Sequence, residues 1–404
     1  MFAKTYGATD VADPPRERLG YREAVLFIGL STLVVALERF GFHLVPKDFL
    51  TYRYAARDAF EGRDIYAGTI SGPDLAGQPF TYTPFAALIF RAFGVLDQQL
   101  SYLIWTAASL TGLGLLIHAL RPVRSGRAFL LACATTVVFT NVAAGQVNIF
   151  LMGLCLLDLG SRGRLKGFTG VGVGLAAAIK LTPALFIVYL AITRQWKPLR
   201  TSLLTGALTT GLGYLVFPQL SKEFFGHALW NLQERVRLDH ALGYWGNASL
   251  SGALHAAGGG TAPFIPLAVL AITVAALAGA RVAYLYGHPL NAVLIVGLAA
   301  PMASPFAWGH HYIYLIPTLL VLVRSMPEVG SVEAVYRVRA VSLIWLLLVL
   351  GPGTGHWLLH RGIEWLLPLG LIVREGPLLA GCLCIVLLVR SSTQAKVAVE
   401  ERVW

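Results

Sequence analysis

The sequence predicts an all-α protein that crosses a membrane many times, and its composition and loop charges carry this prediction. Hydrophobic residues make up 56% of the 404 residues and charged residues only 13%, with a mean hydropathy of +0.65. Long apolar runs are expected to fold as helices, because a helix satisfies its own backbone groups in lipid. The formal net charge of +11 gathers in short links, so it indicates membrane orientation rather than a nucleic-acid partner.

The basic links set the predicted orientation. Residues 121–127, 161–167 and 194–200 each contain several Arg or Lys residues and no acidic residue. Cytoplasmic loops of membrane proteins carry such an excess of positive charge. We therefore expect these three links to lie in the cytoplasm.

The rest of the topology follows from this orientation. Residues 1–23 lack a cleavable signal and are expected to form a cytoplasmic segment. A single transmembrane domain, 24–390, begins with a helix at 24–43 and continues into a first external loop, 44–100. Residues 391–404 form a cytoplasmic tail, so both termini are cytoplasmic in the plasma membrane. We expect about 12 transmembrane helices, and they lie near 24–43, 101–120, 128–142, 147–160, the two halves of 168–193, 201–218, 262–281, 289–303, 312–324, 340–353 and 376–390. Residues 84–96 and 354–375 are interpreted as interfacial or re-entrant.

The first external loop contains a short amphipathic helix. Asp48 opens a segment whose apolar residues have helical spacing, and Gly62 ends it where a helix stop is expected. The segment is too charged to cross a bilayer, so we expect it to lie on the outer membrane surface. Asp48 is either the N-cap of this helix, a common role for Asp, or a functional carboxylate.

Lys180 lies at the predicted apex of a membrane hairpin. The apolar stretch 168–193 has basic links at both ends, so it must cross the membrane twice. The Lys180 side chain divides it into two half-spans that meet on the external side. Lys180 either extends its ammonium to the lipid surface or serves a function, as ionisable residues at membrane depth often do.

Most polar candidates fall on the predicted external side, whereas the cytoplasmic side offers only basic links and no nucleotide fingerprint. The alternatives are structural: Gln146 and Asn148 would satisfy a tight turn, and His310 and His311 would belong to an aromatic belt beside Trp308. The four cysteines lie in apolar runs without metal-ligand partners. The candidates are Asp48, Tyr82, Gln146, Asn148, Lys180, Trp245, Asn247, Trp308, His310 and His311.

Several motifs carry a family resemblance. The succession DFLTYRYAARDAFEGRDIY, PFTYTPFAALIF, AAGQVNIFLMGLCLLDLG, AAIKLTPALFIVYL, GNASLSGAL and SPFAWGHHYIYLIP resembles glycosyltransferase family 87. These proteins are polyprenol-phosphate-mannose-dependent mannosyltransferases of the GT-C architecture. The chain is most similar to members that add an α-1,2-linked mannose to phosphatidylinositol mannosides on the periplasmic face. Thr83 stands where the family more usually has a tyrosine before the proline.

The resemblance implies a mechanism. The family's aspartate in the first external loop corresponds to Asp48, which would act as general base in an inverting transfer. Lys180, with His310 or His311, would stabilise the leaving lipid phosphate. The other candidates would position sugars, through hydrogen bonds from Gln146, Asn148 and Asn247 and through stacking on Tyr82, Trp245 and Trp308. The expected partners are a polyprenyl-phosphate-mannose donor, a glycolipid acceptor and membrane lipids. We expect a monomer without cofactor or metal.

Two other functions remain open at this point. An arabinofuranosyltransferase would use a related polyprenyl-phosphate donor on the same fold. A transporter or flippase of lipid-linked sugars, from a different class, would place polar groups through the membrane midplane and on both faces.

Overall fold

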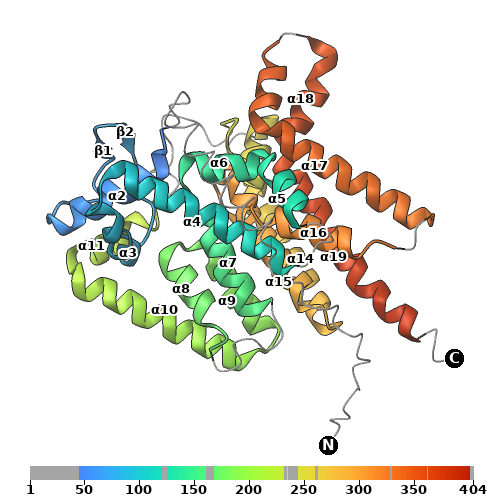
Figure 1. Cartoon of the computed structure of the whole chain (residues 1–404), viewed down its shortest axis with the longest axis horizontal. Coiled ribbons are helices and arrows are strands. Elements are labelled where there is room, and N and C mark those ends of the chain that lie inside the picture. The colour runs from blue at the N-terminus through green and yellow to red at the C-terminus, as the bar shows by residue number, and fades with distance from the viewer. Residues whose placement is uncertain are drawn as a thin grey trace, which may run out of the picture.

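The computed structural model describes residues 45–120, 125–160, 168–231, 234, 244–259, 263–327, 330–361 and 363–400. The predicted segments 1–23 and 24–43 lie outside this range. The described part is almost entirely helical, apart from a small hairpin of β1 and β2 (Figure 1). The first half contains α2 (Lys47–Phe60), β1 (Ile70–Gly72), β2 (Leu75–Gln78), α3 (Pro84–Gly94), α4 (Gln98–Ala119), α5 (Ser125–Cys133), α6 (Thr136–Ala144), α7 (Asn148–Leu159), α8 (Val171–Ile179), η1 (Thr182–Ala184), α9 (Leu185–Ile192) and α10 (Trp196–Val216).

The second half continues with shorter helices and then long ones. Its elements are α11 (Pro218–Glu223), η2 (Phe224–Ala228), α13 (Leu250–Leu254), η3 (His255–Gly259), α14 (Phe264–Leu285), α15 (Pro289–Ala303), η4 (Gly309–Tyr312), α16 (Leu315–Arg324), α17 (Val332–Leu359), η5 (Glu364–Leu366), α18 (Leu367–Arg374) and α19 (Gly376–Glu400). In Figure 1, α2, α3 and α11 gather at one end of the molecule, α17 extends to the opposite side, and α18 projects at the top of the view.

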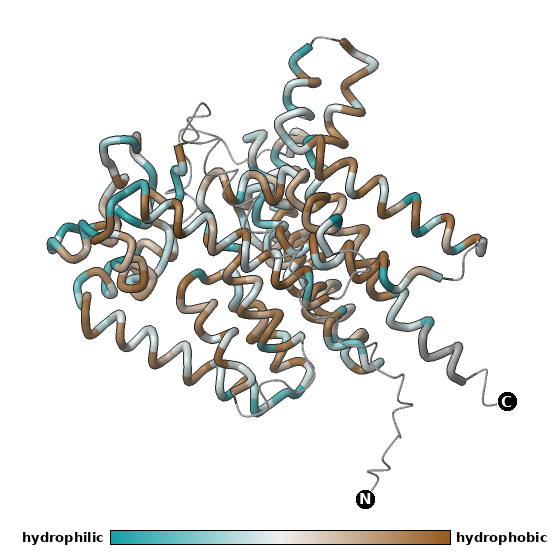
Figure 2. The backbone as a smooth tube through the Cα atoms, viewed as in Figure 1, coloured by the Kyte–Doolittle hydropathy of each residue, from teal (hydrophilic) through white to brown (hydrophobic). Residues whose placement is uncertain are grey.

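The protein is a multi-pass membrane protein. Within the described residues, α4, α14, α17 and the first part of α19 are long and apolar enough to span a membrane. The helices α5 and α6 form a further candidate that is bent by 72°. Shorter apolar helices include α3, α7, α15 and the segment Thr182–Ile192, which contains α9. Figure 2 shows hydrophobic residues dominating α7 and α9. The count of about 12 spans and the external placement of α2 stay predictions.

The predicted span 128–142 is not one continuous helix, because the chain bends at Thr135, and its crossing of the membrane stays a prediction. The Thr135 hydroxyl accepts a hydrogen bond from the Val138 backbone N–H and donates one to the Ala132 carbonyl. It thereby caps α6 and leaves α5 as a separate helix. A single threonine with its own local hydrogen bonds offers the backbone an alternative to a continuous helix.

The predicted hairpin at 168–193 is present. Lys180 has an extended backbone conformation between α8 and α9. Gly170, just before α8, packs so closely against Pro198 and Thr201, after α9, that a Cβ at this position would lie 2.2 Å from the Pro198 carbonyl oxygen. The two ends of the hairpin therefore meet, and Lys180 lies at its apex.

Helix α2 begins one residue before Asp48. The N-cap position belongs to Pro46 and has no side-chain hydrogen bond, while Asp48 lies in the first helical turn. The capping interpretation of Asp48 is therefore wrong. The helix ends at Phe60, and Gly62 with a φ of +76° follows it, as expected. Protein covers much of α2, because residues on several of its faces are buried against α3, α4 and the β-hairpin.

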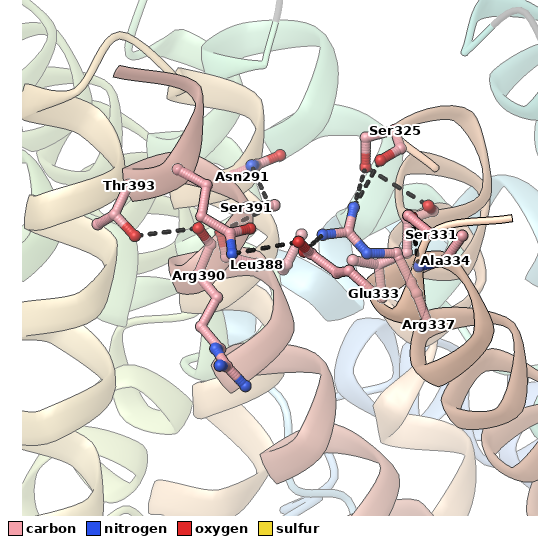
Figure 3. A network of polar contacts seen from close by, with 12 residues as sticks. Asn291, Ser325, Ser331, Glu333, Ala334, Arg337, Leu388, Arg390, Ser391 and Thr393 are labelled. Atoms are coloured by element: carbon pink, nitrogen blue, oxygen red, sulfur yellow. Dashed lines mark hydrogen bonds and ion pairs between the residues drawn. The ribbon is translucent and has the colours of Figure 1, made fainter. Parts of the chain in front are cut away.

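A polar network centred on the buried side chain of Arg337 joins the ends of α16, α17 and α19 (Figure 3). Arg337 is 6% exposed. Its guanidinium donates to the Ser325 carbonyl and to the Glu333 carboxylate, the latter at 2.9 Å. Glu333 also accepts a hydrogen bond from Gln394 of α19 at 3.4 Å. One arginine thus satisfies acceptors on two neighbouring helices.

Replacing Arg337 with alanine should destabilise the protein by about 1 kcal/mol, because it removes hydrogen bonds to exposed groups of Ser325 and Glu333, which water can then satisfy. Arg339→Ala is the matched control, since Arg339 lies on the same helix and is exposed. Thermal unfolding in detergent should show a lower melting temperature for Arg337→Ala and almost none of this effect for Arg339→Ala. Equal melting temperatures for the two variants would contradict the assigned role.

Candidate active site

The turn between α6 and α7 determines where α2 lies. Gly145 ends α6 with a φ of +70°, and the Gln146 backbone N–H donates to the Asn141 carbonyl at 2.8 Å. A Cβ added to Gly145 would lie 2.5 Å from the Cβ of Phe49. The absence of a side chain therefore lets the first turn of α2 rest on this turn. The contact places Asp48 next to Gln146.

Gln146 connects Asp48 to two tyrosines. Its side chain hydrogen-bonds to the Asp48 carboxylate, while its Oε1 lies 3.1 Å from the Tyr52 hydroxyl and 3.3 Å from the Tyr82 hydroxyl. The two hydroxyls are 2.7 Å apart. Gln146, Tyr52 and Tyr82 are each at most 5% exposed, so this cluster is a fixed support beneath the carboxylate.

Burial tunes the basicity of Asp48. Desolvation raises the pKa of its carboxyl to about 6, although the hydrogen bond from Gln146 and the charge of Lys180 favour the ionised form and lower the pKa. The group is therefore ionised at neutral pH but is a stronger base than an exposed aspartate. A carboxylate with these properties suits general-base catalysis.

A chain of amides holds Lys180. Its Nζ donates to Asn148 Oδ1 at 3.0 Å, and Asn148 Nδ2 donates to Asn141 Oδ1 at 3.2 Å. Asn141 in turn donates to the His310 carbonyl at 2.8 Å. The Lys180 ammonium also lies 5.2 Å from the centre of the Tyr82 ring, in cation–π range. The lysine points into the protein rather than toward lipid, which opposes the snorkelling interpretation.

His311 presents a second donor beside Lys180. The Trp308 backbone N–H donates to His311 Nδ1 at 3.3 Å, which leaves the proton of a neutral imidazole on Nε2. His311 Nε2 lies 3.4 Å from Lys180 Nζ. Two hydrogen-bond donors that share one space favour an anionic oxygen between them.

His310 lies next to this pair. Its ring is in edge contact with the His311 ring, with 4.8 Å between centroids, and parallel to the Trp308 ring. His310 Nε2 is buried and has no hydrogen-bond partner among the described residues. This nitrogen is enclosed by protein, so the contact of His310 with a substrate hydroxyl stays a prediction.

Trp245, Asn247 and Trp308 belong to an adjoining loop cluster. Asn247 Oδ1 accepts hydrogen bonds from the Ser249 and Ala307 backbone N–H groups, at 3.2 and 3.0 Å. This amide ties the loop to the segment that carries His310 and His311. The Trp245 ring stacks on His356 of α17 at 4.8 Å. The structure thus gives Asn247 and Trp245 packing roles, and their contact with substrate stays a prediction.

A largely apolar cavity adjoins the Lys180 site. Asn148 and His311, which both contact Lys180, contribute to its wall. The rest of the wall includes Leu151, Met152, Thr182, Pro183, Phe186, Pro301, Ile313 and Tyr314. The cavity has a volume of about 40 Å³, so it has room for only the first carbons of a hydrocarbon chain attached to an anionic group at the donors.

Comparisons with known proteins place the chain in a family. Residues 80–305 match the model of glycosyltransferase family 87. The chain belongs to glycosyltransferase family 87. It is 30% identical over 325 residues, 74% of each chain, to a polyprenol-phosphate-mannose-dependent alpha-(1-2)-phosphatidylinositol mannoside mannosyltransferase of Mycobacterium tuberculosis.

Two further comparisons extend over more of this family 87 chain. It is 28% identical to a polyprenol-phosphate-mannose-dependent alpha-(1-2)-phosphatidylinositol pentamannoside mannosyltransferase of Mycolicibacterium smegmatis, covering 89% of this chain and 87% of the relative. A crystal structure of ArnT from Cupriavidus metallidurans bound to undecaprenyl phosphate aligns with 92% of this chain and 77% of that chain, at 18% identity and a TM-score of 0.35.

The structure brings together a central set of the predicted residues of this family 87 enzyme. Asp48, Tyr82, Gln146, Asn148, Lys180, His310 and His311 form one connected cluster. Sequence analysis missed two of its supports. Tyr52 is one of the apolar residues with helical spacing in the segment that Asp48 opens, and because it follows Asp48 by four residues it shares the helix face of Asp48. Asn141 lies within an apolar run, and no sequence signal identifies it as a support for Lys180.

The raised pKa of Asp48 predicts a pH-dependent stability. The folded-state pKa of Asp48, about 6, exceeds the usual 3.8, so the folded state binds the proton more tightly than the unfolded state. The protein therefore loses stability as the pH rises from about 3.8 to about 6, and the loss is complete above pH 6. At pH 7.5 the free energy of unfolding of Asp48→Asn should therefore exceed that of wild type by up to about 3 kcal/mol, seen as a higher melting temperature. The difference should vanish near pH 4. Exposed Asp74 provides the control Asp74→Asn. A gain of the same size at both pH values would argue against a buried, proton-binding Asp48.

Proposed function

We propose that this protein transfers mannose from a polyprenyl-phosphate-mannose donor to a phosphatidylinositol mannoside, forming an α-1,2 linkage on the extracytoplasmic face. The observation that carries the proposal is the joint presence of a carboxylate base and a donor pair, cationic Lys180 and neutral His311, in one partly buried site beside an apolar cavity. The names of the relatives support the choice of donor and acceptor.

The donor phosphate lies between Lys180 and His311. Both groups donate hydrogen bonds into the same space, and their donors match phosphate oxygens. The first part of the polyprenyl chain occupies the adjoining cavity, whose wall includes Leu151, Met152 and Phe186. This arrangement leaves the mannose near the carboxylate side of the site.

The reaction is a single displacement at the anomeric carbon. The oxygen of the acceptor hydroxyl forms a bond to this carbon while the bond from the carbon to the phosphate oxygen breaks. Asp48 takes the proton of the attacking hydroxyl. The electron pair of the broken bond stays on the lipid phosphate, where Lys180 and His311 stabilise the developing charge. One displacement inverts the anomeric configuration, and the phosphate leaves without a proton donor.

The remaining candidates hold these groups and the sugars. Gln146 keeps its bond to Asp48, and Asn148 holds Lys180 in place. His310 offers its unpartnered ring nitrogen to a sugar hydroxyl. We place the acceptor sugars against Trp308 and Tyr244, whose rings pack edge to face at 6.0 Å.

The proposal includes a monomeric enzyme of the plasma membrane with cytoplasmic termini. It needs no cofactor besides its lipid-linked substrate. Charge on the leaving phosphate is balanced by protein side chains, so we propose a metal-independent reaction. Addition of a chelator to the transfer assay tests this point, and loss of transfer that Mg²⁺ or Mn²⁺ restores would contradict it.

Asp48→Asn should abolish mannosyl transfer while the protein remains folded and inserted. Asparagine keeps the size and polarity of the side chain but cannot accept the proton, so a loss of at least about 10²-fold in kcat is expected. The measurement is transfer of labelled mannose from polyprenyl-phosphate mannose in membranes, with Asp74→Asn as the matched control. Wild-type transfer should also decline as the pH falls below about 6, the pKa of Asp48.

Transfer by Asp48→Asn at the wild-type rate would exclude this base. Absence of transfer in wild type, with transfer from a polyprenyl-phosphate arabinose donor, would favour an arabinofuranosyltransferase instead. Movement of lipid-linked sugar across the membrane without transfer would favour a flippase.

Lys180→Gln should weaken the contact with the donor phosphate. The amide can still hydrogen-bond to Asn148, but its positive charge is lost, so kcat/KM for the donor should fall by about 10²-fold. Lys222→Gln, at an exposed lysine of α11, is the control. The same assay at varied donor and acceptor concentrations separates the two substrates. An effect on the acceptor alone would place Lys180 outside the phosphate site.

A further inference from the structure

Tyr52 is held more firmly than a residue of the apolar face of α2 requires. It is 1% exposed, and its ring stacks on Phe90 with 4.4 Å between centroids and an interplanar angle of 12°. Edge contacts with Tyr82 and Trp105 fix the remaining sides of the ring. The hydroxyl therefore has one available position, next to Gln146.

The hydrogen bonds at this hydroxyl define a direction. Tyr52 and Tyr82 each carry one hydroxyl proton, and three oxygen–oxygen contacts join them with Gln146 Oε1. The Val147 backbone N–H also donates to the Tyr52 oxygen. When the two hydroxyl protons are assigned to the two shortest contacts, Tyr82 donates to Tyr52 at 2.7 Å and Tyr52 donates to Gln146 Oε1 at 3.1 Å.

We propose that Tyr52 is a positioning residue that fixes the orientation of the Gln146 amide, so that the amide N–H faces the Asp48 carboxylate. The two polar atoms of the Gln146 amide differ, since Oε1 only accepts hydrogen bonds and Nε2 only donates them. A carboxylate only accepts, so its contact with Gln146 needs Nε2. This inference rests on the proposed role of Asp48 as base.

Loss of the Tyr52 hydroxyl would release the amide. Gln146 Oε1 would lose its shortest contact and keep only the 3.3 Å contact with the Tyr82 hydroxyl, so the amide N–H would be held less firmly against the carboxylate. A weaker hydrogen bond to the ionised carboxylate favours protonated Asp48. The other groups that act on Asp48 are Lys47 of α2, Lys180 at the hairpin apex, and Tyr82 before α3, and the substitution leaves them in place.

Tyr52→Phe is the test, because it removes the hydroxyl and keeps the ring contacts. We expect the acidic limb of the kcat profile to move upward by about one pH unit and kcat at pH 6.5 to fall about threefold, with an unchanged KM for the donor. Tyr189→Phe is the matched control. Tyr189 is a buried tyrosine that also hydrogen-bonds to a glutamine side chain, Gln195.

A double-mutant cycle separates positioning from a general loss of stability. If Tyr52 acts only through Gln146, the variant Tyr52→Phe/Gln146→Ala should have the kcat of Gln146→Ala alone. Additive losses would overturn the proposal. So would an unshifted pH profile for Tyr52→Phe, or an equal shift for Tyr189→Phe.

A second readout does not depend on mannosyl transfer. The pH at which wild type loses stability relative to Asp48→Asn reports protonation of Asp48 in the folded protein, and Tyr52→Phe should raise this pH also. If wild type transfers no mannose, the proposed function fails, but this shift still supports the orientation of the amide. Absence of the shift in a folded variant overturns the positioning role whatever the substrate is.

Discussion

The close contact between Gly145 and Phe49 is the constraint on which the site depends. Asp48 precedes Phe49, and Gln146 follows Gly145, so the contact fixes the carboxylate and the amide as neighbours. A side chain at position 145 would push α2 away and would also be strained at a φ of +70°. The same turn begins α7 and places Asn148 where it holds Lys180. One glycine thus positions both charges.

Helix packing explains why this contact is stable. The face of α2 below Phe49 is filled by aromatic rings of α3 and α4, among them Phe93, Tyr102 and Trp105, with centroids 5.2 to 6.0 Å apart. Aromatic packing of this kind adds to the stabilisation from burial alone. Thr83 connects α3 to the same frame, because its hydroxyl caps α3 and donates to the Ala178 carbonyl of α8. The departure from the family's usual residue at this position therefore keeps a structural function.

Sequence analysis identified the charged members of the site and missed their supports. Asp48 and Lys180 were recognisable because a charge is costly near lipid and so indicates function. The N-cap interpretation of Asp48 was wrong because the helix starts at Lys47 and its N-cap is Pro46, a shift of two residues that helix signals do not resolve. Tyr52 and Asn141 were missed because their role depends on partners far along the chain, Gln146 and His310. The bend at Thr135 likewise reflects a local hydrogen-bond competition that hydropathy does not register.

The two charges of the site are kept apart, and this separation suits the proposed reaction. Asp48 and Lys180 are close enough for the charge of each to favour ionisation of the other, yet each has its own amide partner. Gln146 binds the carboxylate, and Asn148 binds the ammonium. A direct ion pair would neutralise both groups and would fill the space that a substrate needs. Because neutral amides satisfy them instead, the carboxylate remains able to accept a proton while the ammonium remains able to bind phosphate.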